Sequence, residues 1–299
     1  NLMKMNQGRL NINIDKSISE LESMLKEFRL KKPIYKMFFR GKGLEFDGYR
    51  NFSPDEDAGN IDWKASSRAQ KLLVKQYVEE RDLRIMFIID VGDNMVFGST
   101  EKIKCEFITE LAAAFSNVII HSNDRIGFVL FSKGIVNFSD CRAGERQFNF
   151  FIETLSNGSN YGGISNIDQV LDFALNSFDK SISSVILISD FLKISENTKK
   201  KLFLLSNRFE TIVIRVRDPL DVTLPEIGKE IVLENPATHE QILINPNIAK
   251  KAYEIYALEQ GKKVEEIFKK SGVDYLDLLT DKSFTVPLAI FLKKRLEGR

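Results

Sequence analysis

The sequence has few cysteines, few histidines and no long apolar run. Its 299 residues include only Cys105, Cys141, His121 and His239 as thiol or imidazole side chains. Two cysteines are too few for a disulfide framework, and this set excludes the usual zinc sites of cysteine and histidine. No stretch is long and apolar enough to cross a bilayer, and the polar first residues do not resemble a signal peptide. We therefore expect the protein to reside in the cytoplasm, which is a reducing compartment.

An excess of charge of one sign is also lacking. The 43 Lys and Arg residues against 42 Asp and Glu residues give a formal net charge of +1 at pH 7. This balance provides no bulk attraction to nucleic acid or to an anionic membrane surface. With 43% hydrophobic and 28% charged residues, the chain is expected to be globular and to have core for one large domain or two moderate ones.

Motifs of common catalytic sites are missing as well. The segment GKGLEFDG has no Lys-Ser or Lys-Thr ending and precedes no predicted helix, so it is not a phosphate-binding loop. There is no Gly-x-Ser-x-Gly nucleophile elbow. A phosphatase of the haloacid dehalogenase type would need a second Asp two residues after Asp90, where this chain has Gly92. We therefore expect that the protein is not an enzyme.

The first 83 residues are predicted to form two small regions. Residues 1–39 contain an amphipathic helix at 15–32, whose apolar side is expected to pack on its own domain. The apolar residues at helical spacing are Ile18, Leu21, Met24, Leu25 and Phe28. Residues 40–83 are rich in turns and charges, and the pieces GLEFDGYRNF and KLLVKQYVEE are typical of strands. We predict a small antiparallel β region there.

Strands and helices are predicted to alternate over residues 84–220. Strands are expected at 84–90, 125–131, 134–138, 185–190 and 211–216, and helices at 101–121, 146–155, 167–178 and 198–209. Because parallel strands need crossover connections, this order predicts an α/β fold with a doubly wound, mostly parallel sheet and helices on both faces. Residues 221–299 are predicted as a C-terminal extension. It would contain a hairpin at 230–235 and 240–244, then helices at 248–270 and 284–295.

Two of these strands end in an aspartate. Asp90 closes MFIID and Asp190 closes VILISD, at the carboxyl edge where such sheets bind ligands. Ser165 follows the turn Gly162-Gly163 and would present its hydroxyl at the same edge, although it could equally be only a helix N-cap. Carboxylates near buried strand ends must be paired, solvated or bound to a cation. We therefore predict a site at this edge.

These residues carry a family resemblance. The segments IIDVGDNMVFGS, GGISNI and LISDF resemble the three loops of the metal-ion-dependent adhesion site in von Willebrand factor A domains. The segment before the first of these loops, residues 41–83, closely resembles the signature of domain of unknown function 58, a family of MoxR-associated proteins with a von Willebrand factor A-like domain. We call it the signature segment. Its specific elements are Ile61-Asp62-Trp63 and Glu79-Glu80-Arg81, and RVRDPLDVTLPEIG resembles the family's continuation. The resemblance covers roughly residues 32–295. It implies a bacterial protein with a von Willebrand factor A-like sheet, a small N-terminal β region and a helical C-terminal cap.

The adhesion site is incomplete in this chain. The family's first loop reads Asp-x-Ser-x-Ser, whereas this chain has Gly92 and Asn94 at the serine positions, and Ser165 replaces the usual Thr. The resemblance implies a degenerate metal site, which would consist of Asp90, Asn94, Ser165 and Asp190, with Asp93 as a compensating ligand. Magnesium requires near-octahedral oxygen coordination, which this set supplies poorly. We expect no resident cofactor, and weak or absent binding of magnesium or manganese.

Both signs of charge surround Trp63 in the signature segment. Because large aromatic rings are mostly buried and buried charges are paired, we predict a network of structural anchors in this segment. The predicted anchors are Asp62, Trp63, Arg68, Glu80 and Arg81. The alternative is that this region is a docking face, since aromatic residues and arginine are enriched in interfaces. The predicted partner-docking residues are Phe52, Asp55 and Glu56.

From these features we expect a non-enzymatic protein-interaction module, an adaptor or chaperone-like partner that docks through the carboxyl edge of its sheet. The resemblance implies a MoxR-type AAA ATPase and membrane-anchored von Willebrand A proteins as partners. We expect no nucleic-acid partner and no direct membrane insertion, although partners could hold the protein at the inner membrane. The alternative function is a metal-dependent phosphodiesterase or nuclease in which Asp90 and Asp190 hold the metal ions.

Overall fold

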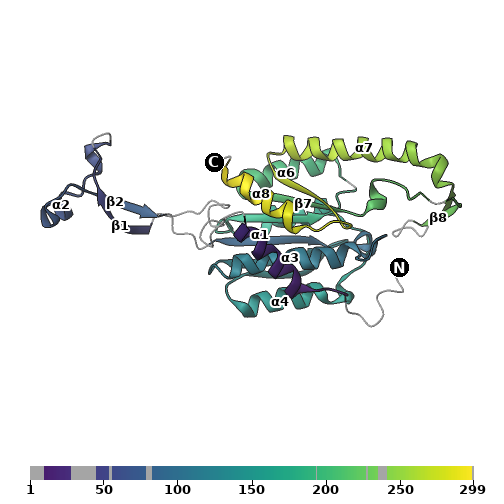
Figure 1. Ribbon diagram of the computed structural model, residues 1–299, viewed down its shortest axis with the longest axis horizontal. Coiled ribbons are helices and arrows are strands. Elements are labelled where there is room, and N and C mark those ends of the chain that lie inside the picture. Colours follow the sequence, from purple (N-terminus) through teal and green to yellow (C-terminus); the bar gives the residue numbers. More distant parts are fainter. Residues whose placement is uncertain are drawn as a thin grey trace. The chain divides into compact units, whose positions relative to one another are not determined.

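The computed structural model describes residues 10–27, 45–53, 56–78, 83–192, 194–226, 228–234 and 241–297 (Figure 1). The chain divides into two compact units. One comprises Arg40–Asp82, and the other comprises Asn1–Phe39 together with Leu83–Arg299. Both boundaries fall at the edges of the charged signature segment.

A six-stranded sheet forms the centre of the larger unit. Its strand order is β10-β7-β6-β3-β4-β5. The strands are β3 (Arg84–Asp90), β4 (Arg125–Phe131), β5 (Ile135–Arg142), β6 (Ser184–Ser189), β7 (Glu210–Arg217) and β10 (Asp274–Leu279). Neighbouring strands run parallel except for β4 and β5, which are antiparallel. The predicted mostly parallel α/β sheet is therefore confirmed.

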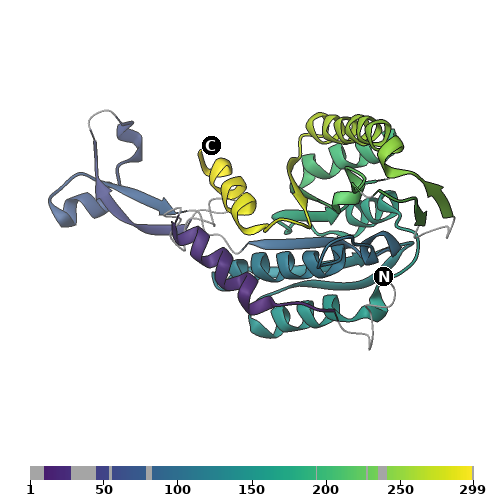
Figure 2. The same cartoon turned by 45° about the vertical axis from the view of Figure 1, so that its right-hand side comes forward.

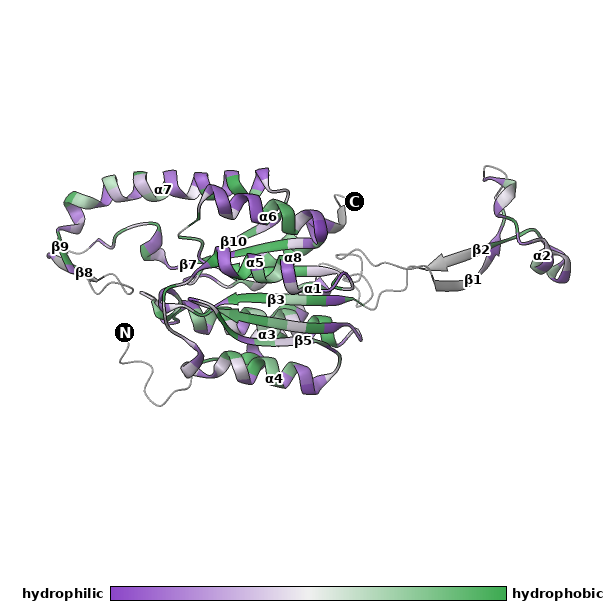
Figure 3. Ribbon diagram, turned by 180° about the vertical axis from the view of Figure 1, so that it is seen from behind, coloured by the Kyte–Doolittle hydropathy of each residue, from purple (hydrophilic) through white to green (hydrophobic). Residues whose placement is uncertain are grey.

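Helices cover both faces of this sheet (Figures 1 and 2). One face carries α1 (Ile14–Glu27), α3 (Lys104–Ile120), α4 (Glu145–Ser156) and α8 (Thr285–Glu297), and the other carries α5 (Ile167–Ser177), α6 (Glu196–Arg208) and α7 (Pro246–Lys270). Strand β3 shows why two cores form. Ile85 and Phe87 pack in one core, whereas Met86 and Ile88 pack in the other, because successive side chains point to opposite faces. Figure 3 shows the apolar strands between more polar helices.

The N-terminal helix packs on its own unit, as its apolar stripe predicts. Leu21 and Leu25 of α1 are buried in the same core as α3. Among the helices of the described ranges, none combines the length and apolarity that a bilayer crossing requires. The C-terminal segment includes the expected hairpin, formed by β8 (Ile231–Glu234) and β9 (Gln241–Ile244).

Strand β10 was not predicted. Its sequence DYLDLL carries two charged side chains in six residues, which favours a turn over a strand in local analysis. In the fold it is an edge strand parallel to β7, and Asp277 accepts a hydrogen bond from Nε of Arg215 at 2.9 Å. This pairing with a charged neighbour makes the strand possible, because it neutralises the aspartate at the sheet edge.

The described residues of the smaller unit form a hairpin, a short α-helix and a 3₁₀ turn. Strands β1 (Glu45–Asn51) and β2 (Leu73–Val78) are antiparallel, and α2 (Trp63–Ala69) lies between them in sequence. Asp62 is the N-cap of α2, where its Oδ1 accepts the N–H groups of Lys64 at 3.1 Å and Ala65 at 3.0 Å. Its Oδ2 accepts the Tyr49 hydroxyl at 3.2 Å and lies 3.5 Å from Nζ of Lys75. Asp62 therefore links the helix to both strands.

The expectation that Trp63 is buried is wrong. The ring is 64% exposed at the first residue of α2, and Arg68 is also exposed. The helix buries only Ser66. The described residues of this unit form two strands and two short helices, α2 and the 3₁₀ helix η3 (Ala58–Asn60), and these form no second layer that covers the ring. Glu80 and Arg81, the other predicted anchors, lie outside the described residues.

Candidate functional site

The structure brings four of the predicted site residues together at the carboxyl edge of the sheet. Asp90 ends β3, and Asp190 directly follows the adjacent parallel strand β6. Asn94 lies in a short 3₁₀ helix, η4 (Asp93–Val96), and Ser165 lies just before α5. Only 2% of Asp90 and 3% of Asp190 is exposed, so both carboxylates need polar partners from the protein.

Four donors satisfy the Asp90 carboxylate. Its Oδ1 accepts the N–H of Gly92 at 2.9 Å and the hydroxyl of Ser165. Its Oδ2 accepts the hydroxyl of Ser189 at 2.7 Å and the Asn94 amide at 3.3 Å. Burial and the nearby charge of Asp190 nevertheless raise the pKa of Asp90 to about 6. Hydrogen bonds thus fix the position of the Asp90 side chain, while burial and the charge of Asp190 disfavour its ionised form.

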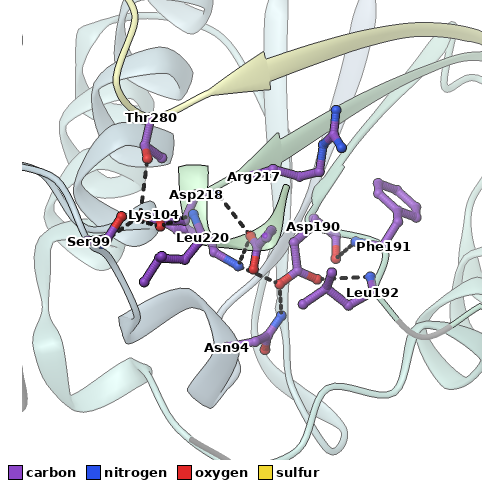
Figure 4. Close-up of polar contacts among 12 residues, drawn as sticks. Asn94, Ser99, Lys104, Asp190, Phe191, Leu192, Arg217, Asp218, Leu220 and Thr280 are labelled. Carbon is purple, nitrogen blue, oxygen red and sulfur yellow. Dashed lines mark hydrogen bonds and ion pairs between the residues drawn. The ribbon is translucent and has the colours of Figure 1, made fainter. Parts of the chain in front are cut away.

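A buried lysine that the sequence analysis missed provides the cation of the site. Lys104, the first residue of α3, is 1% exposed, and its Nζ lies 3.0 Å from Oδ2 of Asp190 and 2.7 Å from Oδ2 of Asp221 (Figure 4). Burial alone would lower the pKa of Lys104, but the carboxylates of Asp190 and Asp221 outweigh this effect and raise it. Lys104 is therefore an ammonium ion at neutral pH. The sequence feature that could have identified Lys104 is its position at the start of a long apolar helix.

Asn94 also acts as a donor toward both carboxylates. Its Nδ2 donates to Oδ2 of Asp190 at 2.9 Å and to Oδ2 of Asp90 at 3.3 Å, while its Oδ1 accepts the Ser165 hydroxyl at 2.9 Å. A ligand of a cation would have to present oxygen at this position. Asp93, the predicted compensating ligand, instead accepts the N–H of Gly163 at 2.9 Å and so connects two loops.

The glycine at position 92 is required by the packing around it. A Cβ atom built there would lie 2.0 Å from Oγ of Ser165 and 2.7 Å from Oδ1 of Asn94. A serine at this position, as in the complete family motif, would therefore clash with the observed positions of both side chains. Gly92 and the closed arrangement of Ser165 and Asn94 therefore belong together.

The residues at this edge do not fit a resident divalent cation. Oδ2 of Asp190 already accepts the Lys104 ammonium and the Asn94 amide, and both oxygens of Asp90 accept two donors each. Within the described ranges, no group of three or more His, Cys, Asp or Glu side chains is arranged to hold a metal ion. Hard cations such as magnesium require several free oxygen ligands at once.

The network continues into two further loops (Figure 4). Asp221 lies in the 3₁₀ helix η6 (Pro219–Asp221), which follows β7, and its Oδ2 also accepts the N–H of Asp218 at 2.8 Å. The buried Asp218 accepts the N–H of Ser99 at 2.7 Å and the hydroxyl of Thr280 at 3.4 Å. The loops after β3, β6, β7 and β10 are therefore joined by hydrogen bonds and ion pairs into one connected edge.

A strained residue supports Asp190. Phe191 has a φ of 53°, a conformation that bulky residues rarely adopt. Its ring packs edge-on against Phe268 with centroids 5.0 Å apart, and the next residue, Leu192, donates its N–H to Oδ1 of Asp190 at 3.3 Å. Strain of this kind, of order 1–3 kcal/mol, is concentrated at functional sites.

The predicted docking residues of the signature segment belong to the smaller unit. Phe52 is half-buried, and the Glu56 carboxylate pairs with Nη1 of Arg50 at 2.6 Å. Asp55 lies outside the described residues.

Comparison with known proteins relates the chain to one family. The model of the family described as protein of unknown function DUF58 matches residues 48–263. An uncharacterized protein of Mycobacterium tuberculosis H37Rv is 23% identical over 261 residues, which cover 86% of this chain and 81% of that protein.

Several solved structures are also similar. A conserved hypothetical protein, BatB, from Bacteroides thetaiotaomicron is 14% identical with a TM-score of 0.46, over 73% of this chain and all of that chain. A von Willebrand factor type A structure from Catenulispora acidiphila is 11% identical with a TM-score of 0.42, over 76% of this chain and 44% of that chain.

Proposed function

The chain belongs to the DUF58 family of proteins of unknown function, and we propose that it is a non-enzymatic interaction module that docks proteins through the carboxyl edge of its sheet. The observation that carries this proposal is the Lys104 ammonium, buried between the carboxylates of Asp190 and Asp221. This internal cation offsets part of the negative charge of the two carboxylates, and Asp90 is held by uncharged donors, so that docking there needs no metal ion. The role is that of an adaptor or chaperone-like partner.

The connected loops support docking because they are rigid before a partner arrives. Side-chain bonds from Asp90, Asn94, Asp190 and Asp218 join the loops that would form the contact surface. A surface that is already ordered loses less conformational entropy on binding. Exposed apolar side chains at this edge, Ile164 at 54% and Leu192 at 55% exposure, would provide the area to be buried.

The same contacts argue against the nuclease alternative. Metal-dependent hydrolysis would require carboxylate oxygens that are open to metal ions and water. Asp90 and Asp190 instead accept hydrogen bonds from Ser189, Asn94 and Lys104. Metal-dependent hydrolysis of a phosphodiester by the wild-type protein, lost in Asp190→Ala, would favour the nuclease over the adaptor.

The family resemblance directs the choice of partner. We propose a MoxR-type AAA ATPase and membrane-anchored von Willebrand A proteins, which would place the protein in the cytoplasm, at the inner membrane when it is bound. The test is calorimetric titration of the purified chain with such an ATPase, in buffer with EDTA and in buffer with magnesium. We expect equal affinity in both buffers and no turnover of a substrate by the chain itself.

The docking face is tested by one substitution on an exposed side chain. Ile164→Asp places a charge at the carboxyl edge without removing a buried group, and it should lower the affinity at least tenfold. Leu204→Asp changes a side chain of equal exposure, 54%, on α6 and serves as the matched control. Equal affinity of both variants would contradict docking through this edge, and a need for magnesium would contradict the role of Lys104.

A further inference from the structure

A cavity of about 500 Å³ adjoins Asp190 at the carboxyl edge. It is bounded by the loop after β6, by the end of β7 and by α7. Leu192, Val264 and Ile267 contribute apolar wall, and Tyr256 adds an aromatic side chain. The cavity lies entirely within the larger unit, and neither Asp90 nor Asn94 lines it.

Arg217 presents a guanidinium group to this cavity. Its Nε donates to Oδ1 of Asp277 at 3.1 Å, and 19% of the side chain is exposed. Among the described residues, no hydrogen-bond acceptor engages Nη1 or Nη2. In Figure 4 the Arg217 side chain extends away from Lys104. The group is therefore anchored at one edge, and its other edge is available for a ligand.

The carboxylates around the cavity already have cationic partners. Asp190 and Asp221 pair with Lys104, and Glu196 pairs with Lys199 at 2.9 Å. Glu266 likewise pairs with Lys270 at 3.2 Å. These ion pairs do not involve Arg217, and the carboxylate that Arg217 contacts, Asp277, is shared with Arg215.

A glycine keeps the space beside this guanidinium open. Gly261 lies in the interior of α7, where glycine costs about 1 kcal/mol relative to alanine. A Cβ atom at this position would lie 4.0 Å from Nη1 of Arg217, which is ordinary contact, with no other atom nearby. Any larger side chain would extend into the cavity alongside the arginine.

We propose that this cavity binds a carboxylate, donated by an acidic side chain of the docked partner, through Nη1 and Nη2 of Arg217. The inference rests on the proposed function and names the chemistry by which the partner is recognised. A planar guanidinium matches the two oxygens of a carboxylate, and such bidentate pairs are strong where water is partly excluded. The apolar walls would contact the methylene groups of a glutamate or aspartate side chain.

The first experiment measures the carboxylate site alone, with glutarate as the probe. Nuclear magnetic resonance titration of the full chain should show saturable binding in the millimolar range, which is about 4 kcal/mol of binding free energy. Arg217→Met and Gly261→Leu should each weaken binding at least tenfold, whereas Gly261→Ala should retain it. Leucine is a better helix former than glycine, so Gly261→Leu should not lower the unfolding temperature, and its effect reports on the cavity.

The same titration with inorganic phosphate tests whether the site prefers a carboxylate to another anion. Phosphate that binds as well as glutarate, or glutarate binding that survives both Arg217→Met and Gly261→Leu, would overturn the assignment.

The second experiment separates this inference from the proposed function by titrating the ATPase into the same variants. An ATPase that binds wild type and Gly261→Leu equally would refute the cavity as the partner's carboxylate site. Failure of the wild type to bind any of the proposed partners would refute the docking function instead, while leaving the glutarate result as evidence for the site itself.

Discussion

Removal of the Lys104 ammonium is the most informative perturbation of the edge. Lys104→Met keeps most of the side-chain volume and leaves the buried Asp190 and the largely buried Asp221 without their cation. Removing one member of a buried ion pair typically costs about 3–5 kcal/mol, because the remaining charge is uncompensated. We expect urea denaturation at pH 7 to show a loss of unfolding free energy in this range for Lys104→Met.

A double-mutant cycle assigns that loss to the ion pair. Asp221→Asn keeps the oxygen that accepts the Asp218 N–H and removes one of the two unpaired charges. The double variant should therefore be more stable than the sum of the single effects predicts, by at least about 1 kcal/mol. Lys200→Met, at an exposed lysine of α6, is the matched control and should be within about 0.5 kcal/mol of wild type.

The same variant tests whether the lysine takes the place of a metal ion. With the ammonium gone, Asp190 and Asp221 leave two buried negative charges, which favour a divalent cation. We expect manganese to bind Lys104→Met and to recover part of the lost stability by mass action, with no effect on the wild type. A loss below about 1 kcal/mol, additive single effects, or equal manganese binding by wild type and variant would refute the reasoning.

Three further measurements test other parts of the structure. The raised pKa of Asp90, about 6 against 3.8 when unfolded, gives a stabilisation that is complete below pH 3.8 and disappears as the pH rises through 6. It amounts to about 3 kcal/mol. Urea denaturation from pH 4 to 7 should show this decline in wild type but not in Asp90→Asn, and parallel curves would contradict it. Gly92→Ser should lower the unfolding free energy by about 1–3 kcal/mol through its clash with Ser165. Ser165→Ala should relieve part of this loss, and a double variant no more stable than Gly92→Ser would argue against the clash. Trp63 is the only tryptophan, so its fluorescence should be that of a solvated indole and be readily quenched by acrylamide. A blue-shifted, protected emission would contradict its exposure.

Local sequence patterns were sufficient to predict most strands and helices of the larger unit. The continuous apolar runs of β3 and β4 and the helical spacing of α1 and α5 depend on residues close in sequence, and the strand boundaries of β3 and β4 agree with the prediction. Strand β10 was not predicted because its local sequence does not favour a strand. Its two aspartates favour a turn locally, and their cationic partners come from other elements: Arg215 on β7 for Asp277 and Arg295 on α8 for Asp274.

Burial of single side chains depended on what covers them. Local reasoning expected Trp63 in a core, because large aromatic rings are usually buried. The ring is exposed because the described residues of the smaller unit form no second layer over it, and the number of layers over a helix is a property of the whole unit.

The sequence by itself determined where the carboxylates of the candidate site lie. Asp90 and Asp190 follow buried parallel strands, and the carboxyl ends of adjacent parallel strands meet at one edge. Only the tertiary structure decided what compensates their burial, which is a set of uncharged donors around Asp90 and a cation beside Asp190. Lys104 is 86 positions from Asp190 in sequence, yet their charged atoms lie 3.0 Å apart. Electrostatic pairing depends on distance in space and on exclusion of water, and both arise only when the helix packs against the strand ends.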